Sequence, residues 1–376
     1  MRREPAAEKL NMSLKFLVPA VLAGQLAGCG TLAPHRPAHD LIVTAAKPGH
    51  LFVLDPRKLK AVSDFTIPGA HDYITTIVPS PDGKIAYLLV DRGMRIVGLD
   101  LRTGKEVFRA DLSTAGERVQ SMGFDVTPDG KELIVYELRT LLGIDTYTVE
   151  PPQFALFSTS GGLYATPLRK FPAPRRIQAV LASKDGRGFY AFWPDVYHFD
   201  LKTGRLLDDR ALLDWGRRDH TSTDLSINSP ASEPTGIYSL PLYSTLTGTG
   251  LPADGVRATS LMTLDLHTGK LAYHDISQTA PNIFSTIISP DRRWAFGVFD
   301  ALYKIDLQHW AIVKQAPIAH SYYIVNVSSD GQELYLGGNM CDIAIYDAHT
   351  LREKGDIKLP GCGDQALVMS RVIARQ

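Results

Sequence analysis

The chain has 376 residues and equal numbers of acidic and basic side chains, so its formal net charge is zero. A neutral chain has no bulk electrostatic attraction to nucleic acid or acidic membranes, which excludes charge-driven binding to either. The hydrophobic content of 44% indicates a globular protein with a sizeable core, and the 24 prolines and 31 glycines indicate many turns, which favours β structure.

The N-terminal segment, residues 1–39, is expected to lie outside the fold. A basic start is followed by the apolar run FLVPAVLAG and then by Leu26-Ala27-Gly28-Cys29. Residues 1–29 resemble a bacterial lipoprotein signal peptide, which implies a lipid anchor on Cys29, a tether over 30–39 and a location on the periplasmic side of the envelope. Gly30 after the cysteine favours the outer membrane. The alternative is a cleaved secretory signal with a chance cysteine.

Two short motifs recur along the rest of the chain. The first is an apolar pair or triplet followed by a polar residue and a turn, in seven copies spaced by 41 to 65 residues. Its polar positions are Asp55, Asp100, Ser158, Asp200, Asp265, Asp306 and Asp347. The second is a turn with Asp, usually Asp-Gly, between apolar runs, as in SPDGKIAYLL at 80–89 and SSDGQELYLG at 328–337. Asp-Gly between alternating runs is a hairpin signal.

Together the motifs describe a four-stranded unit of about 40 residues, which is typical of a β-propeller blade. Seven units predict an all-β, seven-bladed β-propeller over residues 40–376. The first unit lacks its innermost strand, because the chain enters it directly at 41–46. We expect the C-terminal strand, 366–374, to supply that strand by pairing with the N-terminal blade and so to close the ring.

The two faces of such a propeller should differ. The short Asp-Gly and Thr-Gly turns fall on one face, here called the short-turn face, and the longer connections fall on the other, the elaborated face. Two insertions, 139–153 and 245–258, are expected as loops on the elaborated face, where function concentrates.

Polar residues are expected to form a ring where the innermost strands begin on the elaborated face. Counting back from each turn Asp gives the pairs Asp72/Tyr73, Val119/Gln120, Arg175/Arg176, Pro281/Asn282 and His320/Ser321, with Tyr322, Tyr323 and Phe284 just inside. Of these we single out Asp72, Tyr73, Arg175, Arg176, His320 and Tyr322 as candidate contacts for a partner. The alternative is a solvated rim without a function.

Cys341 and Cys362 are expected to form a disulfide. They lie at nearly equal distances from the turn at 348–353, so antiparallel pairing of the flanking strands brings them together. An exported compartment is oxidising, which favours the bridge. The alternative is two buried free thiols.

Motifs that carry catalysis are missing from the sequence. It contains no GxSxG, HExxH, P-loop or EF-hand pattern and no CxxCH for a c-type haem. We therefore expect no catalytic residues, no cofactor-binding residues and no metal ligands in this chain.

Several stretches resemble the β subunit of quinohemoprotein amine dehydrogenase. The strongest is HSYYIVNVSSDGQELYLGG at 320–338 with IAIYDAHTLREKGDIKLPG at 343–361, and 109–122 and 285–307 are also similar. The resemblance implies a propeller subunit without a redox group in a periplasmic complex that oxidises primary amines to aldehydes. It also implies two partners, a small subunit carrying a cysteine tryptophylquinone and a larger one carrying two c-type haems. The lipobox is a departure from that family.

Two other functions remain open from the sequence. One is an envelope lipoprotein that acts as a protein-interaction scaffold, and the other is a lactonase-like propeller hydrolase with a metal in its channel. Co-purification with a haem protein and a quinone protein would separate the first function from these two.

Overall fold

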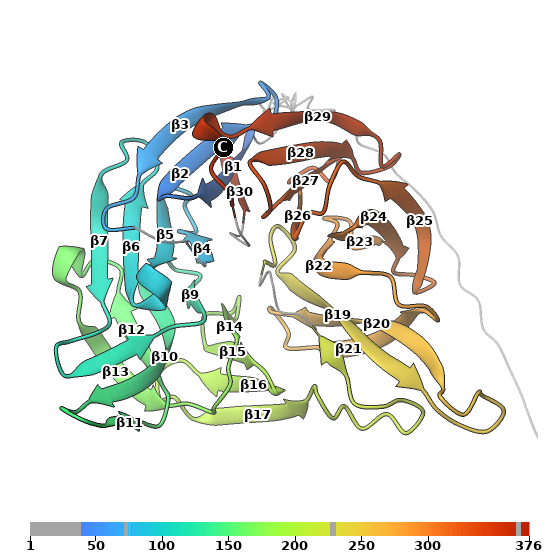
Figure 1. The fold of residues 1–376 in the computed structure, drawn as a ribbon, viewed down its shortest axis with the longest axis horizontal. Helices are drawn as coiled ribbons and strands as arrows, with labels where there is room; N and C mark the ends of the chain where they lie inside the picture. Colours follow the sequence, from blue (N-terminus) through green and yellow to red (C-terminus); the bar gives the residue numbers. More distant parts are fainter. Residues whose placement is uncertain (1–38, 71–73, 75, 226–230, 366–369, 376) are drawn as a thin grey trace, which may run out of the picture. The chain divides into compact units, whose positions relative to one another are not determined.

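The computed structural model describes residues 39–70, 74, 76–225, 231–365 and 370–375. In these ranges the chain forms seven small antiparallel sheets that follow one another around a ring, viewed down its axis in Figure 1. The predicted all-β, seven-bladed β-propeller is therefore confirmed. None of the helices in the described ranges is long and apolar enough to cross a membrane.

The first four blades follow the chain in order. Blade one holds β1 (His39–Ala46), β2 (His50–Asp55), β3 (Lys60–Thr66) and β30 (Arg371–Arg375), and blade two holds β4 (Thr76–Pro79), β5 (Ile85–Val90), β6 (Arg95–Asp100) and β7 (Glu106–Asp111). Blade three holds β8 (Glu117–Gln120), β9 (Phe124–Val126), β10 (Glu132–Leu142), β11 (Tyr147–Val149), β12 (Gln153–Ser158) and β13 (Pro167–Pro172). Blade four holds β14 (Ala179–Ala182), β15 (Gly188–Phe192), β16 (Asp195–Asp200) and β17 (Leu206–Ala211).

The last three blades complete the ring. Blade five holds β18 (Asp224–Leu225), β19 (Ile237–Leu246), β20 (Val256–Asp265) and β21 (Leu271–Ser277), and blade six holds β22 (Ile283–Ile288), β23 (Trp294–Phe299), β24 (Ala301–Asp306) and β25 (Ala311–Pro317). Blade seven holds β26 (Ile324–Val327), β27 (Glu333–Gly337), β28 (Asp342–Asp347) and β29 (Glu353–Lys358). Three single-turn 3-10 helices, η1 (Asp91–Gly93), η2 (Gly162–Tyr164) and η3 (Pro360–Cys362), lie in connections.

The ring closes through the C-terminal strand, as predicted, although the strand is Arg371–Arg375 and residues 366–369 of the predicted range lie outside the described residues. β30 pairs antiparallel with β1 and forms the innermost strand of blade one, with Ile42 opposite Val372 and Leu41 opposite Ile373. The sheet order in this blade is β3-β2-β1-β30. Closure in this way satisfies the inner edge of β1, which would otherwise present unpaired N–H and C=O groups.

The two sequence motifs are explained by side-chain hydrogen bonds inside the short turns. In the Asp-Gly turn between β4 and β5, the Ser80 hydroxyl donates to Asp82 at 2.7 Å, and Gly83 takes the positive φ of 66° that the turn requires. In the turn between β6 and β7, Asp100 accepts the backbone N–H of Thr103 at 2.7 Å and its hydroxyl at 2.8 Å. These contacts are local, which is why the motifs recur in most blades.

Burial falls from the inside of the ring to the outside. The innermost strands β14 and β26 are buried at every position, because both of their faces pack against neighbouring blades. The outermost strand β3 alternates between exposed and partly buried residues, since only one of its faces is covered.

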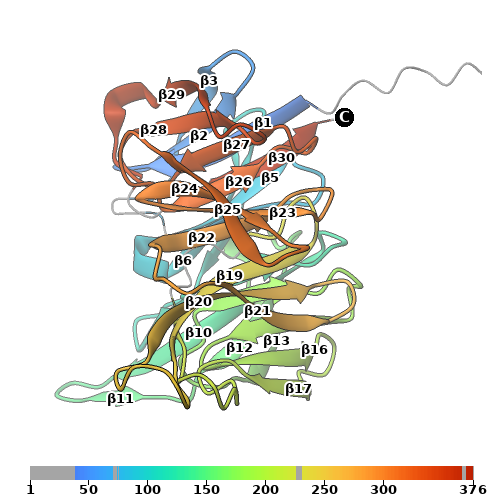
Figure 2. The ribbon, with the colours of Figure 1, turned by 90° about the vertical axis from the view of Figure 1, so that its right-hand side faces the viewer.

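Of the two predicted insertions, 139–153 is mostly strand, whereas 245–258 contains the expected loop at 247–255 between two strand ends. Most of 139–153 continues β10 to Leu142 and adds β11, which pairs with it, while β8 pairs with β10 on the other side. The segment 245–258 lies in the β19–β20 hairpin, which is paired from Ile237 opposite Asp265 to Leu246 opposite Val256. Backbone pairing in the first segment satisfies N–H and C=O groups that a loop would leave to solvent. Figure 2 shows the β11 region projecting at the edge of the propeller.

Candidate interaction site at the channel mouth

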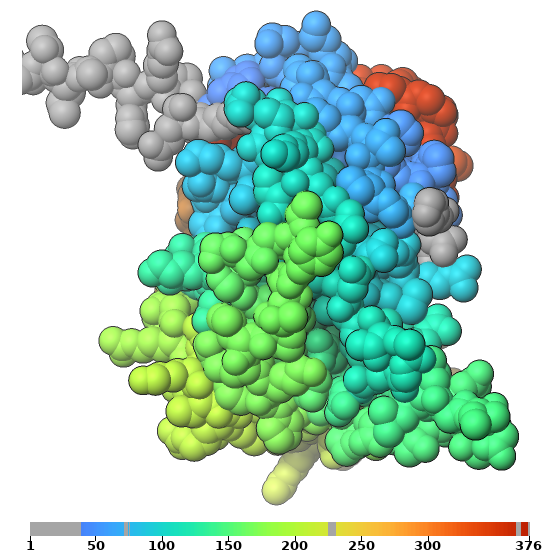
Figure 3. All heavy atoms as spheres, turned by 90° about the vertical axis from the view of Figure 1, so that its left-hand side faces the viewer, coloured from blue at the N-terminus to red at the C-terminus, as the bar shows by residue number. Residues whose placement is uncertain are grey.

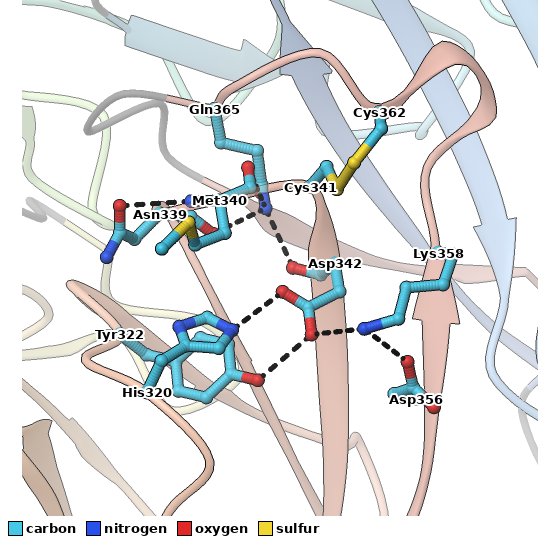
Figure 4. The surroundings of a disulfide bond; sticks show 10 residues. All are labelled: His320, Tyr322, Asn339, Met340, Cys341, Asp342, Asp356, Lys358, Cys362 and Gln365. Carbon is cyan, nitrogen blue, oxygen red and sulfur yellow. Dashed lines mark hydrogen bonds and ion pairs between the residues drawn. A yellow bond between two sulfur atoms is a disulfide. The ribbon is translucent and has the colours of Figure 1, made fainter.

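The centre of the candidate site is Asp342, at the start of β28 on the elaborated face. Its side chain is only 5% exposed, and it accepts from His320 Nε2 at 3.0 Å, from the Tyr322 hydroxyl at 3.2 Å and from Lys358 Nζ at 3.0 Å. Figure 4 shows the three donors converging on this one carboxylate. A carboxylate only accepts, so the network fixes the hydroxyl of Tyr322 and places the Nε2 proton on His320.

Electrostatics in this network follow from burial and from the carboxylates. Burial raises the pKa of Tyr322 above its ordinary value, and the adjacent Asp342 charge raises it further, so the phenol stays protonated and donates. Hydrogen bonds to Asp356 and Asp342 raise the pKa of Lys358, which stays a cation. The cation of Lys358 is therefore paired with the carboxylates of Asp342 and Asp356.

The predicted disulfide joins Cys341 and Cys362, with a Cα–Cα distance of 4.8 Å. Cys341 directly precedes Asp342, and Leu359 donates its N–H to the Cys341 carbonyl at 2.8 Å. The bridge thus ties η3 to the start of β28, beside the carboxylate that holds His320 and Tyr322. This confirms the pairing that the hairpin geometry predicted.

Gln365 is a structural residue that sequence reasoning missed. Its fully buried amide donates to the Asp342 carbonyl at 2.7 Å, while its carbonyl oxygen accepts the N–H of Gly338 at 3.2 Å and the Thr44 hydroxyl at 3.1 Å. One side chain therefore connects blade one, blade seven and the C-terminal segment. Sequence reasoning detects repeated local patterns, and the single glutamine after GCGD belongs to no such pattern.

Three aromatic rings form a stack at the elaborated ends of blades six and seven. Phe284 and Phe299 lie with centroids 3.8 Å apart and planes 10° apart, and Tyr323 stacks on both at 5.4 and 5.6 Å. All three rings are partly exposed. Asp300, next to Phe299, accepts the amide of Asn282 at 2.9 Å. The mouth thus presents a rigid aromatic surface with polar groups at its edge.

The predicted ring residues are only partly brought together. Arg175 and Arg176 are exposed in the turn before β14, and His320 lies at the surface of the Asp342 network. Tyr322 is 1% exposed, so it lies beneath the surface and supports His320 from below. Asp72 and Tyr73 lie outside the described residues. The role of these side chains toward a partner stays a prediction.

The register counting was wrong for one pair. Val119 and Gln120 do not open an innermost strand, because they belong to β8, which pairs with β10. The innermost strand of blade three is β9, which starts at Phe124. The extra strand shifted the count, and Val119 is buried as part of the apolar core.

A second charged cluster lies in the channel toward the short-turn face. A cavity of about 370 Å³ is lined there by Asp125, Lys184 and Glu233 among apolar residues. Glu233, beside blade five, pairs with Arg371 of the closing strand at 2.5 Å. Asp125 accepts the N–H of Ala182 at 2.8 Å and so connects blades three and four, while burial raises its pKa. The first pairing links blade five to the closing strand of blade one, and the second links two neighbouring blades.

No group of three or more His, Cys, Asp or Glu side chains that could hold a metal occurs in the described ranges. On its observed contacts, the mouth is a surface that is braced in blade seven. Its components are an aromatic stack, exposed basic residues and an immobilised histidine.

Comparisons with known proteins show the fold. No protein-family model matches the chain, and no curated protein matches it. Among solved structures it is similar to the Kuenenia stuttgartiensis hydrazine synthase, with a TM-score of 0.53 and 13% identity over 86% of this chain and 93% of that one. It is also similar to dihydro-heme d1 dehydrogenase NirN in complex with DHE, with a TM-score of 0.52 and 16% identity over 85% of this chain and 73% of that one. At these identities the likeness shows a β-propeller fold.

Proposed function

We propose that this chain is the propeller subunit, without a redox group of its own, of an amine dehydrogenase complex that oxidises primary amines to aldehydes. In this proposal a small partner carries the cysteine tryptophylquinone and a larger partner carries two c-type haems. The propeller holds both partners and closes the quinone site against water. The sequence resemblance at 320–338 and 343–361 supplies the identity of the partners.

The observation that carries the proposal is the bracing of the elaborated face. A disulfide, the Gln365 amide and three donors on Asp342 immobilise the blade-seven side of the mouth, beside the partly exposed rings, and exposed arginines lie on the blade-four side. Aromatic and Arg side chains are the usual anchors of protein interfaces, and a preorganised surface loses little entropy on binding. Rigidity of this kind suits a subunit that must hold others in fixed geometry.

The similar structures give support at the level of architecture. One is named as a hydrazine synthase and the other as a dihydro-heme d1 dehydrogenase, so propellers of this shape occur in enzymes with redox chemistry. The support is an analogy of fold, and the function rests on the residues of the mouth.

The location follows the N-terminal segment. We propose that Cys29 is the first residue of the mature chain and that it carries a lipid anchor on the periplasmic side of the envelope, with the outer membrane favoured by Gly30. Mass spectrometry of the N-terminal peptide checks this directly. An unmodified N-terminus at another residue would contradict it.

The function is tested by co-purification of the tagged chain from its native cells, with staining for haem and for quinone. We expect one haem band and one quinone band to follow the wild-type chain. The double variant Arg175→Glu/Arg176→Glu should reduce both bands by roughly tenfold, because it reverses the charge of interface anchors.

Blade four provides a matched control, since Lys202 and Arg205 are exposed on the opposite, short-turn face. Lys202→Glu/Arg205→Glu makes the same charge change and should leave both bands intact. A chain that purifies without haem or quinone from cells that contain both would contradict the amine dehydrogenase function and favour a scaffold or hydrolase.

A further inference from the structure

Blade three carries a projecting arm that no contact described so far uses. The arm consists of β8, residues 138–142 of β10, and β11, and it continues β10 beyond the elaborated face. Figure 3 shows it standing out from the surface at the lower right. A small antiparallel sheet of this kind normally packs one face against the core and exposes the other. The side chains on the two faces of the arm therefore indicate which face could bind a partner.

Strand register sorts the side chains of the arm onto two faces. Leu142 lies opposite Tyr147 and Thr140 lies opposite Val149, so these side chains share one face with Leu138. The exposed fractions on that face are 37% for Leu138, 38% for Leu142, 76% for Tyr147 and 66% for Val149. We call these four residues the apolar face of the arm.

The other face of the arm is covered by the propeller body only at its base, because Leu141 farther along the same face is 40% exposed. Val119 is opposite Arg139 in the register, and it is 2% exposed within the core that blades two and three share. Arg139 pairs with Glu117 at 2.6 Å on the same face. The apolar face is therefore exposed to solvent along its length, while the other face is covered at its base.

The arm is also held in a fixed shape. Leu142 donates its N–H to Gly116 at 2.9 Å, Gly143 to Thr146 at 2.8 Å and Glu150 to Arg139 at 3.0 Å. Ile144 stands at the tip and is fully exposed, at 108% of its reference area. A preformed apolar surface binds without a large ordering cost, and large exposed apolar patches mark interaction sites.

We propose that the apolar face of the arm packs against the same face of a second copy of this chain, about a two-fold axis. At roughly 150–200 Å² per large side chain, the four residues and Ile144 expose on the order of 500 Å² in each copy. Two copies together reach about 1,000 Å², which is the lower limit for a specific interface. The expected dimer is weak, with a dissociation constant on the order of micromolar.

Two features favour a second copy as the occupant. The face is an exposed sheet surface, and two copies of such a surface can pack face to face about a two-fold axis. The arm also has charges of both signs that make no ion pair within the described part of the chain, namely Arg118 on the apolar face and Asp145 and Glu150 beside it. A two-fold axis can place the cation of one copy against a carboxylate of the other.

The proposal is tested by sedimentation velocity of the full chain with Cys29→Ser, which removes any lipid, from roughly 0.1 to 100 µM. We expect a concentration-dependent shift from monomer to dimer. Tyr147→Glu should raise the dissociation constant at least about tenfold, since it replaces the most exposed large side chain of the face with a charge, and Arg118→Glu should weaken the dimer with a reduced dependence on salt.

Tyr164 is the matched control, because it is 90% exposed on η2 and outside the arm. Tyr164→Glu should leave the dissociation constant unchanged, and equal urea midpoints for both Tyr variants show that folding is intact. A monomer at every concentration would overturn the proposal, as would a dimer that Tyr147→Glu leaves unaltered. The amine dehydrogenase function is independent of either result, because its readout is haem and quinone.

Discussion

Replacing Asp342 with alanine removes the acceptor of three donors at once, and the three losses differ because the donors differ in burial. Lys358 is 69% exposed, so its contact contributes a few tenths of a kcal/mol at most. His320 is 24% exposed, and loss of its bond costs about 1 kcal/mol. Tyr322 is 1% exposed, so its hydroxyl is left buried without an acceptor, at about 2 kcal/mol. The expected destabilisation is therefore about 3 kcal/mol.

Urea unfolding followed by tryptophan fluorescence measures this change, with the slope of the transition as a check on compactness. Lys358→Met is the control for the exposed donor and should shift the free energy of unfolding by less than about 0.5 kcal/mol. Tyr322→Phe alone removes the hydroxyl and should cost about 1 kcal/mol, because Asp342 keeps its other partners.

The double variant Asp342→Ala/Tyr322→Phe decides whether the buried hydroxyl is the main cause. With the hydroxyl absent nothing buried is left unpaired, so the double variant should be about 1–2 kcal/mol more stable than the sum of the single effects predicts. Effects that add within about 0.3 kcal/mol would refute the reasoning, as would a loss for Asp342→Ala below about 1 kcal/mol.

Three further perturbations test the closure of the ring. Replacing Cys341 and Cys362 together with alanine should lower the free energy of unfolding by up to about 3 kcal/mol, the chain-entropy value for a 21-residue separation, and the urea midpoint of oxidised protein checks it. Gln365→Leu should destabilise the chain by about 2–3 kcal/mol, as it leaves buried backbone groups unpaired, while Gln365→Glu tests whether the amide donor is needed. Burial alone would raise the pKa of Glu233, but the charges of Arg371 and a nearby lysine lower it from its ordinary 4.5 to about 2. The stability that the ionised Glu233 contributes above pH 4.5 should therefore be lost as the pH falls from 4.5 to 2. Glu233→Gln should abolish that part of the pH dependence.

The features that sequence could predict are those held by local contacts. The Asp-Gly turns and the Asp-x-x-Thr turns are closed by hydrogen bonds between residues two or three apart, such as Thr103 to Asp100. The local sequence of each repeat therefore predicts its turns. Blade number and ring closure followed from counting these units. The disulfide followed from one hairpin, because antiparallel pairing about a turn determines which residues meet.

The features that sequence could not predict depend on distant partners. Gln365 bonds to Thr44, 321 positions away, and no pattern near either residue signals this contact. β8 pairs with the extension of β10, and this added strand moved Val119 from the expected channel mouth into the core. Asp342 lies one residue before the repeat at 343–351, so the repeat pattern does not reveal the buried carboxylate that accepts from His320 and Tyr322.

Closure of the ring by β30 also sets an order of events during synthesis. β1 and the strand that covers its inner edge are far apart in the chain, since Ile42 lies opposite Val372, 330 positions later. At about 5–20 residues per second, synthesis of that stretch takes on the order of half a minute. Throughout that time blade one presents an open edge that a neighbouring chain can occupy. A chain that stops before Arg371 keeps this edge unpaired, so we expect it to aggregate and not to close as a ring of six blades.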